Sequence, residues 1–167
     1  MKAWIGLGGN REDSGALLAR ALARLAGTPR VRVLRQSRFY RSPPWGVTDQ
    51  PDFVNAVAEL ETGLEPSALL RILRELEHEL GRERSAERWG PRCIDLDLLT
   101  YEMMMLQTGE LLLPHPRMHL RAFVLVPLLE LEPDFVIPGR ESAAQCLQRL
   151  DPGEIAGISP LTPISEE

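Results

Sequence analysis

The chain has 167 residues, with 19 basic against 24 acidic residues and a net charge of −5. This length suits a single domain with its own core, and the net acidity argues against a general nucleic-acid binder. Of the 19 basic residues one is lysine, Lys2, and the remaining 18 are arginine. The chain therefore lacks the lysine that a P-loop, a protein kinase or a Schiff-base enzyme requires, and any phosphate chemistry must depend on arginine.

The hydrophobic patterns predict strands and helices in mixed order. Taken along the chain they are a strand at 3–7, a helix at 13–26, a strand at 31–40, a strand at 52–61, a helix from 66, a strand at 93–101, a short strand at 111–113, and helices at 122–131 and 142–150. Because strands and helices do not alternate regularly, an α+β fold is favoured over a doubly wound sheet. We expect one domain over 1–150 and a poorly ordered tail over 151–167.

Cysteine and histidine are scarce. The two cysteines are too few for a disulfide framework, and with three histidines they make no zinc-binding spacing. No apolar run approaches the 18 residues of a membrane span. We therefore expect a cytoplasmic protein with no membrane or nucleic-acid partner.

The strongest local motif runs from Arg88 to Asp97, with the sequence RWGPRCIDLD. On a strand, Asp95 and Asp97 share one face, where two carboxylates repel each other unless a cation lies between them. Such oxygen ligands suit Mg²⁺, which completes its shell with water and substrate phosphate. The alternative is a solvated strand face without a ligand.

Four arginines precede this acidic pair: Arg82, Arg84, Arg88 and Arg92. Guanidinium groups bind phosphate through two hydrogen bonds at once, so arginines beside a metal site could hold a polyphosphate from both sides. Internal ion pairing with nearby carboxylates is the alternative, above all for Arg88.

A second candidate site lies on the strand at 52–61. Phe53 and Asn55 share one face, and an aromatic ring beside an amide could bind a flat heterocycle by stacking and hydrogen bonding. Phe123 could supply the opposite ring. Taken alone, a phenylalanine at either position is more often a core residue than a ligand contact.

Two further motifs are less informative. His115 stands between prolines and could bind phosphate or be structural. The glycine turn at 6–10 lacks a dinucleotide fingerprint because Arg11 stands where the last glycine belongs. Close strand–helix packing explains these glycines adequately.

Taken together, these segments resemble the family of 6-hydroxymethyl-7,8-dihydropterin pyrophosphokinases of folate biosynthesis. The segments that carry the resemblance are LGGN at 7–10, FYRSPPWG at 39–46, QPDFVNAV at 50–57, Gly81-Arg82, Arg88–Asp97 and LPHPRMHLRAFVLVP at 113–127. The resemblance implies a monomeric α+β fold with a ferredoxin-like core, in which an antiparallel sheet is flanked by helices. It implies a transferase that moves pyrophosphate from ATP to the hydroxymethyl oxygen of the pterin and releases AMP.

The resemblance also implies a role for each matching residue. Asp95 and Asp97 match ligands of two Mg²⁺ ions, and Arg82 and Arg92 match catalytic arginines. The implied pterin-binding residues are Ser42, Pro43, Pro44, Trp45, Phe53, Asn55 and Phe123. The implied ATP-binding residues are Glu77, Arg82, Arg84, Trp89, Arg92, Leu98, His115 and Arg121.

Some positions depart from the pattern of the family. Phe53 stands where some relatives have tyrosine, which keeps the stacking and loses a hydroxyl. Arg74 stands where glutamine is common, and Glu110 and Leu112 replace polar nucleotide contacts. None of these changes touches the acidic pair.

Two other functions fit parts of the pattern. One is a noncatalytic α+β module that binds a nucleotide or a protein, and the other is a small metal-dependent phosphohydrolase. A noncatalytic module would not need both the acidic pair and the face of Phe53 and Asn55. A phosphohydrolase would leave the two aromatic rings, Phe53 and Phe123, unexplained.

Overall fold

The computed structural model describes residues 1–11, 13–44, 51–82 and 94–161. Its centre is an antiparallel sheet of six strands: β1 (Lys2–Gly9), β2 (Val31–Gln36), β3 (Tyr40–Ser42), β4 (Phe53–Thr62), β5 (Asp95–Tyr101) and β8 (Ser159–Pro160). The strands follow the order β5-β1-β4-β3-β8, and β2 pairs with the other half of β4. The long strand β4 therefore pairs with β1 along one edge and with β3 and β2 in turn along the other.

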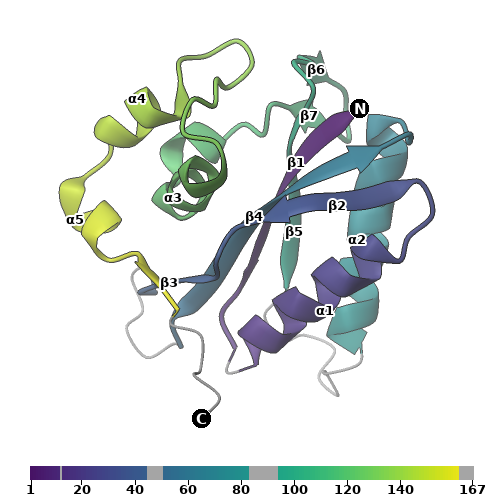
Figure 1. Ribbon diagram of the computed structural model, residues 1–167, viewed down its shortest axis with the longest axis horizontal. Coiled ribbons are helices and arrows are strands. Elements are labelled where there is room, and N and C mark those ends of the chain that lie inside the picture. The colour runs from purple at the N-terminus through teal and green to yellow at the C-terminus, as the bar shows by residue number, and fades with distance from the viewer. Residues whose placement is uncertain (12, 45–50, 83–93, 162–167) are drawn as a thin grey trace.

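The helices divide between the two faces of this sheet. They are α1 (Ser14–Ala26), α2 (Pro66–Arg82), α3 (Ala122–Leu131), α4 (Ala143–Gln148) and α5 (Pro152–Ala156). Figure 1 shows α1 and α2 on one side of the sheet and α3, α4 and α5 on the other. The order β1-α1-β2-β4-α2-β5 is that of a ferredoxin-like fold, which confirms the predicted α+β class.

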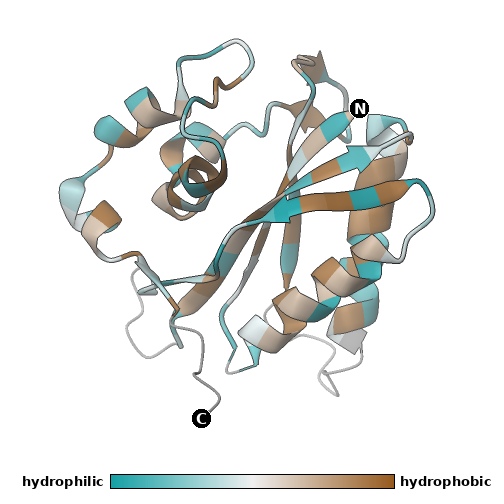
Figure 2. Ribbon diagram, in the orientation of Figure 1, coloured by the Kyte–Doolittle hydropathy of each residue, from teal (hydrophilic) through white to brown (hydrophobic). Residues whose placement is uncertain are grey.

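The face under α1 and α2 is a continuous apolar core. Alternate residues of three strands point into it: Ala3, Ile5 and Leu7 from β1, Ala56, Ala58 and Leu60 from β4, and Leu96 and Leu98 from β5. Leu69, Leu73 and Leu80 of α2 are fully buried against them. Figure 2 shows brown and teal alternating along both helices, as expected for helices with one apolar and one polar face.

The other face has a smaller core under α3. Trp4, Val57 and Leu99 meet Leu125 and Leu128 of this helix there. Pro127 lies inside α3 and is buried, as the sequence predicts for a helix that continues through this proline. This second core covers only part of the face, and the rest of it carries polar residues.

The structure differs from the sequence prediction in three places. The strand expected at 31–40 divides into β2 and β3, because the Ser37 hydroxyl accepts the N–H of Val57 at 3.0 Å in place of a backbone carbonyl. A hairpin of β6 (Leu106–Gln107) and β7 (Leu112–Leu113) extends the short strand predicted at 111–113. The segment 151–161, expected to be poorly ordered, forms α5 and β8.

A 3-10 turn, Met118–Leu120, leads into α3. No helix in the described parts of the chain is long and apolar enough to cross a membrane.

Candidate functional site

Asp95 and Asp97 begin β5, and both face two glycines of β1. Asp95 pairs with Gly8 and Asp97 with Gly6 in the antiparallel register. Directly paired residues carry their side chains on the same face of a sheet, and a Cβ on Gly6 would point at Leu99 of the α3 core. The two carboxylates therefore lie on the α3 face, where Asp95 is exposed and Asp97 is half-buried.

Gly8 separates this acidic pair from a buried amide on the next strand. Its register partner on β4 is Asn55, and a Cβ on Gly8 would lie 2.7 Å from Asn55 Oδ1. Atoms do not approach a real Cβ so closely, so the Asn55 side chain occupies the space that a methyl group would need. The interpretation of these glycines from the sequence was close strand–helix packing. In the structure, Gly6 and Gly8 face away from α1 and leave space for the side chains of the site.

Asn55 is held from its other side by Ser42. Its Nδ2 donates to Ser42 Oγ at 3.2 Å, and both residues are buried. Ser42 in turn pairs with Phe53 across β3 and β4. The predicted face of Phe53 and Asn55 therefore exists, with Phe53 half-buried at its edge.

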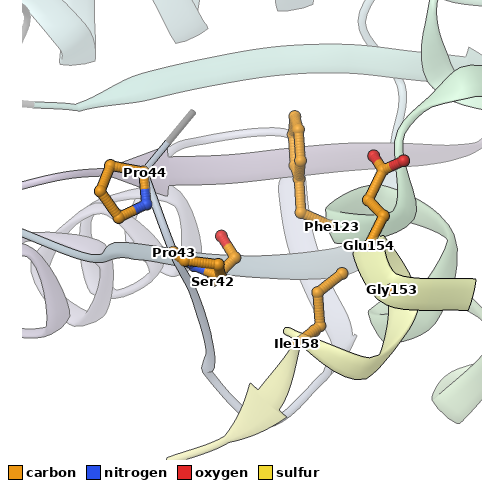
Figure 3. A pocket seen from close by; sticks show the side chains of 7 residues that line it. All are labelled: Ser42, Pro43, Pro44, Phe123, Gly153, Glu154 and Ile158. Atoms are coloured by element: carbon orange, nitrogen blue, oxygen red, sulfur yellow. The ribbon is translucent and has the colours of Figure 1, made fainter. Parts of the chain in front are cut away.

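A pocket of about 310 Å³ lies beside these strands. Its lining residues are Ser42, Pro43, Pro44, Phe123, Gly153, Glu154 and Ile158. Figure 3 shows the prolines of the 42–44 segment across from the Phe123 ring, which projects from α3. Four of the residues predicted to bind a pterin therefore line one pocket, with an apolar character that suits a flat ring.

Sequence reasoning missed the other three lining residues. Gly153, Glu154 and Ile158 come from the C-terminal segment, where high Pro, Gly, Ser and Glu content suggested a tail. The signal that could have found them is the start of α5, where Asp151 precedes Pro152 and its carboxylate accepts the N–H of Gly153 at 2.9 Å. Asp before Pro is a frequent beginning of a helix.

Arg121 connects the acidic pair to the aromatic pocket. Its Nη1 lies 3.6 Å from Asp97 Oδ2, and its Cζ lies 5.5 Å from the centre of the Phe123 ring. A guanidinium group in this position offsets the negative charge of Asp97 and stacks on the ring. One arginine thus contacts both halves of the predicted site.

His115 lies close to the same charges. Its backbone N–H donates to the Leu99 carbonyl at 2.8 Å, and its Nδ1 accepts the N–H of Arg117 at 3.1 Å. Burial lowers the pKa of His115, Asp97 acts in the opposite direction, and Arg121 and Arg117 lower it further. The ring is therefore neutral near pH 7, with Nδ1 as acceptor and Nε2 as the available donor.

The remaining predicted residues are only partly described. Those outside the described residues are Trp45, Arg84, Arg88, Trp89 and Arg92. Arg82 ends α2, and Glu77 lies half-buried on the same helix. Leu98 points into the core under α1 and α2, so any contact of Leu98 with a nucleotide would involve its backbone.

Solved structures share this fold. The chain superposes with a TM-score of 0.67 on a crystal structure described as HPPK-DHPS in complex with substrates, at 12% identity, over 88% of this chain and 42% of the other. The wild-type HPPK-DHPS of Plasmodium falciparum with pteroate gives a TM-score of 0.69, also at 12% identity, over 89% of this chain and 42% of the other. The chain thus spans less than half of these larger proteins, and at this identity the likeness concerns the fold alone.

Sequence comparisons identify the family. The family model described as 7,8-dihydro-6-hydroxymethylpterin-pyrophosphokinase (HPPK) matches residues 4–133. The 2-amino-4-hydroxy-6-hydroxymethyldihydropteridine pyrophosphokinase of Methylorubrum extorquens is 48% identical over 157 residues, which are 94% of this chain and 98% of that protein. The enzyme of the same name from Haemophilus influenzae is 39% identical over 95% of this chain and 98% of its own length. The resemblance predicted from the motifs is confirmed: the chain belongs to the 7,8-dihydro-6-hydroxymethylpterin-pyrophosphokinase family.

Proposed function

We propose that this chain transfers pyrophosphate from ATP to 6-hydroxymethyl-7,8-dihydropterin in folate biosynthesis. Membership of the family supports this reaction. The observation that carries it is the row Asp95–Gly8–Asn55 across β5, β1 and β4. Two strand spacings of about 4.8 Å separate the carboxylate from the amide, roughly 10 Å in all. That span suits a nucleotide phosphate on one side and a pterin on the other.

The acidic pair is suited to Mg²⁺. Asp95 and Asp97 are neighbours on one face, and both are at least partly exposed. Among the described residues no group of three or more acidic, histidine or cysteine side chains is arranged to enclose a metal. Mg²⁺ is commonly bound by one or two carboxylates, with water and phosphate oxygens in the other positions. Two bound ions would neutralise phosphate charge and lower the pKa of the attacking hydroxyl.

The pterin is assigned to the pocket and the adjoining amide. Phe123 and Phe53 would bind its faces, while Pro43 and Pro44 would contact its edge. Asn55 offers one acceptor and one further N–H beyond the bond to Ser42, which suits the donors and acceptors of a pterin edge. Trp45 belongs to the same proposed set.

The nucleotide is assigned to the side of the acidic pair. The proposed contacts are Glu77, Arg82, Arg84, Trp89, Arg92, Leu98, His115 and Arg121. A neutral His115 can donate from Nε2 to a phosphate oxygen. When a bound metal ion neutralises the Asp97 carboxylate, Arg121 can exchange its ion pair with Asp97 for one with a phosphate group. Arg82 and Arg92 would offset the charge on the transferring phosphates. By analogy with other oxyanion donors, each would lower the activation free energy by about 3 kcal/mol.

The reaction needs positioning more than proton transfer. The hydroxymethyl oxygen attacks the β-phosphorus of ATP, the bond from that phosphorus to the bridging oxygen of AMP breaks, and the hydroxyl proton passes to solvent. Charge stabilisation and alignment dominate such phosphoryl transfers. The single site therefore has to hold both substrates in line, which the row of Asp95, Gly8 and Asn55 favours.

One assay tests this function. The chain is incubated with MgATP, with and without 6-hydroxymethyl-7,8-dihydropterin, and adenine nucleotides are separated. AMP that forms only with pterin supports the proposal. ADP, free phosphate from ATP alone, or no turnover would contradict it. The monomeric state and the cytoplasmic location stay predictions, the first to be checked by light scattering.

A further inference from the structure

The C-terminal segment Asp151–Leu161 is tied to the strand that leads into the pocket. In β8, Ser159 pairs with Arg41 and Pro160 with Tyr40. The N–H of Leu161 donates to the carbonyl of Phe39 at 2.8 Å. The segment lies beyond residue 133, where the match to the family model ends. Its position is therefore fixed by backbone pairing next to Ser42 and the two prolines.

A second contact joins the segment to the pocket itself. A Cβ on Gly157 would lie 3.2 Å from Cδ and 3.3 Å from Cγ of Pro43. The absence of a side chain at 157 lets the end of α5 pack directly on the proline ring. Such close packing restricts where Pro43 can lie. A methyl group at position 157 would therefore displace Pro43, which lines the pocket.

Glu154 and Ile158 are the side chains that the segment adds to the pocket. Both are half-buried, and Figure 3 shows Glu154 beside Phe123 with its carboxylate extending in the same direction as the ring. Among the described residues the Glu154 carboxylate has no hydrogen-bond or ion-pair partner. A half-buried carboxylate in a mostly apolar pocket is stabilised most by a ligand that donates N–H groups to it.

We propose that Asp151–Leu161 forms a wall of the pterin pocket, in which Glu154 and Ile158 are substrate-binding residues and Gly157 positions Pro43. The inference rests on the proposed function, because the pterin is the ligand that brings N–H groups and a flat ring to this pocket. The Glu154 carboxylate accepts an N–H of the pterin, and Ile158 makes an apolar contact with the edge of the ring. ATP binds elsewhere and is not contacted by the segment.

Steady-state kinetics of three variants test this proposal. Glu154→Gln keeps the size of the side chain and removes its charge, and we expect KM for the pterin to rise about tenfold, as for loss of a charged hydrogen bond. Ile158→Ala should raise it about threefold to tenfold through lost apolar contact. Gly157→Ala should raise it through displacement of Pro43. In each case we expect KM for MgATP to change less than twofold.

Matched controls separate binding from folding. Glu75→Gln changes an exposed carboxylate on α2, and Gly109→Ala adds a methyl group in open space. Both should leave the pterin KM unchanged. Thermal melting of every variant gives the folded fraction, so an unfolded Gly157→Ala still leaves Glu154→Gln and Ile158→Ala to decide the question.

The outcomes also distinguish the inference from the proposed function. A wild-type chain that makes no AMP from MgATP and pterin contradicts the function itself. A wild-type chain with full turnover, together with Glu154→Gln and Ile158→Ala variants whose pterin KM stays within twofold, overturns the inference alone. An equal rise in KM for both substrates overturns it as well, because a wall of the pterin pocket would not affect ATP.

Discussion

On the α1–α2 face of the sheet, the inward positions of β1, β4 and β5 are alanine, isoleucine and leucine, packed against leucines of two amphipathic helices. On the α3 face the same strands carry a small core at one end and, at the other, two glycines, an amide and two carboxylates. One face of the sheet therefore serves stability alone. The other face is part hydrophobic core and part candidate functional site. The two faces should respond differently to substitution.

The α3 face also uses polar contacts where the other face uses leucine. Arg35 donates to the carbonyl of Leu131 at 2.6 Å and pairs with the buried Glu59 at 2.7 Å. Glu130 accepts from Tyr40 and from Arg38 Nε. Directional contacts of this kind fix where α3 lies on the sheet, which matters because α3 carries Phe123 beside the pocket.

The largest effect is expected for Asp97→Ala. Asp97 is a proposed metal ligand, and its loss should lower kcat/KM by about a thousandfold or more. Because its side chain is only half-buried, the melting temperature should stay close to that of the wild type. The measurement is AMP formation at several Mg²⁺ concentrations, together with a thermal melt. Asp134→Ala, at an exposed position away from the site, is the control. Activity near that of the wild type would disprove the role of Asp97 as a ligand.

On the opposite face, Leu69→Ala should act on stability instead. Leu69 is fully buried in the α1–α2 core, and such a truncation costs about 2–5 kcal/mol of unfolding free energy. Urea unfolding measures this cost, and activity measured well below the melting temperature should remain near that of the wild type. Leu120→Ala, at a residue that is 57% exposed, should cost far less. A Leu69→Ala variant that keeps its stability but loses turnover would reverse the assignment of the two faces.

The contrast between the faces also explains which features could be predicted from sequence. Period-two patterns located β1, β4 and β5, and the short motif around Asp95 and Asp97 identified the acidic pair, because both signals are local. The place of Gly8 against Asn55 depends on the register of two strands separated by more than forty residues, which no local pattern carries. The same holds for Ile158, since β8 pairs with a strand far earlier in the chain.

Gly8→Ala probes the site without removing any of its functional groups. The added Cβ would displace the Asn55 amide, which lies 2.7 Å from its position, and we expect the pterin KM to rise about tenfold to a hundredfold, the equivalent of roughly 1.4–2.8 kcal/mol. Gly6→Ala meets only an ordinary contact of 3.6 Å with Leu99 and should have a smaller effect. Kinetics for both substrates measure the difference.

A double-mutant cycle shows whether Gly8 acts through Asn55. If it does, Gly8→Ala in an Asn55→Ala background should add little to the effect of Asn55→Ala alone, because residues in contact are not additive. Full additivity of the two changes would mean that the methyl group acts by another route, such as a direct clash with substrate.

The smallest effect is expected for Glu130→Gln, and it should depend on pH. Burial raises the pKa of Glu130, but hydrogen bonds from Tyr40 and Arg38 outweigh it, so the pKa lies below its usual value of 4.5. A carboxyl with a depressed pKa contributes stability above its unfolded pKa and loses that contribution as the pH falls through the folded value. The wild type should therefore exceed Glu130→Gln in unfolding free energy at pH 7, and the gap should narrow below about pH 4.5. Urea unfolding at pH 7 and at acidic pH measures both values, and a gap that widens in acid would show that this contact between α3 and β3 does not depend on the charge of Glu130.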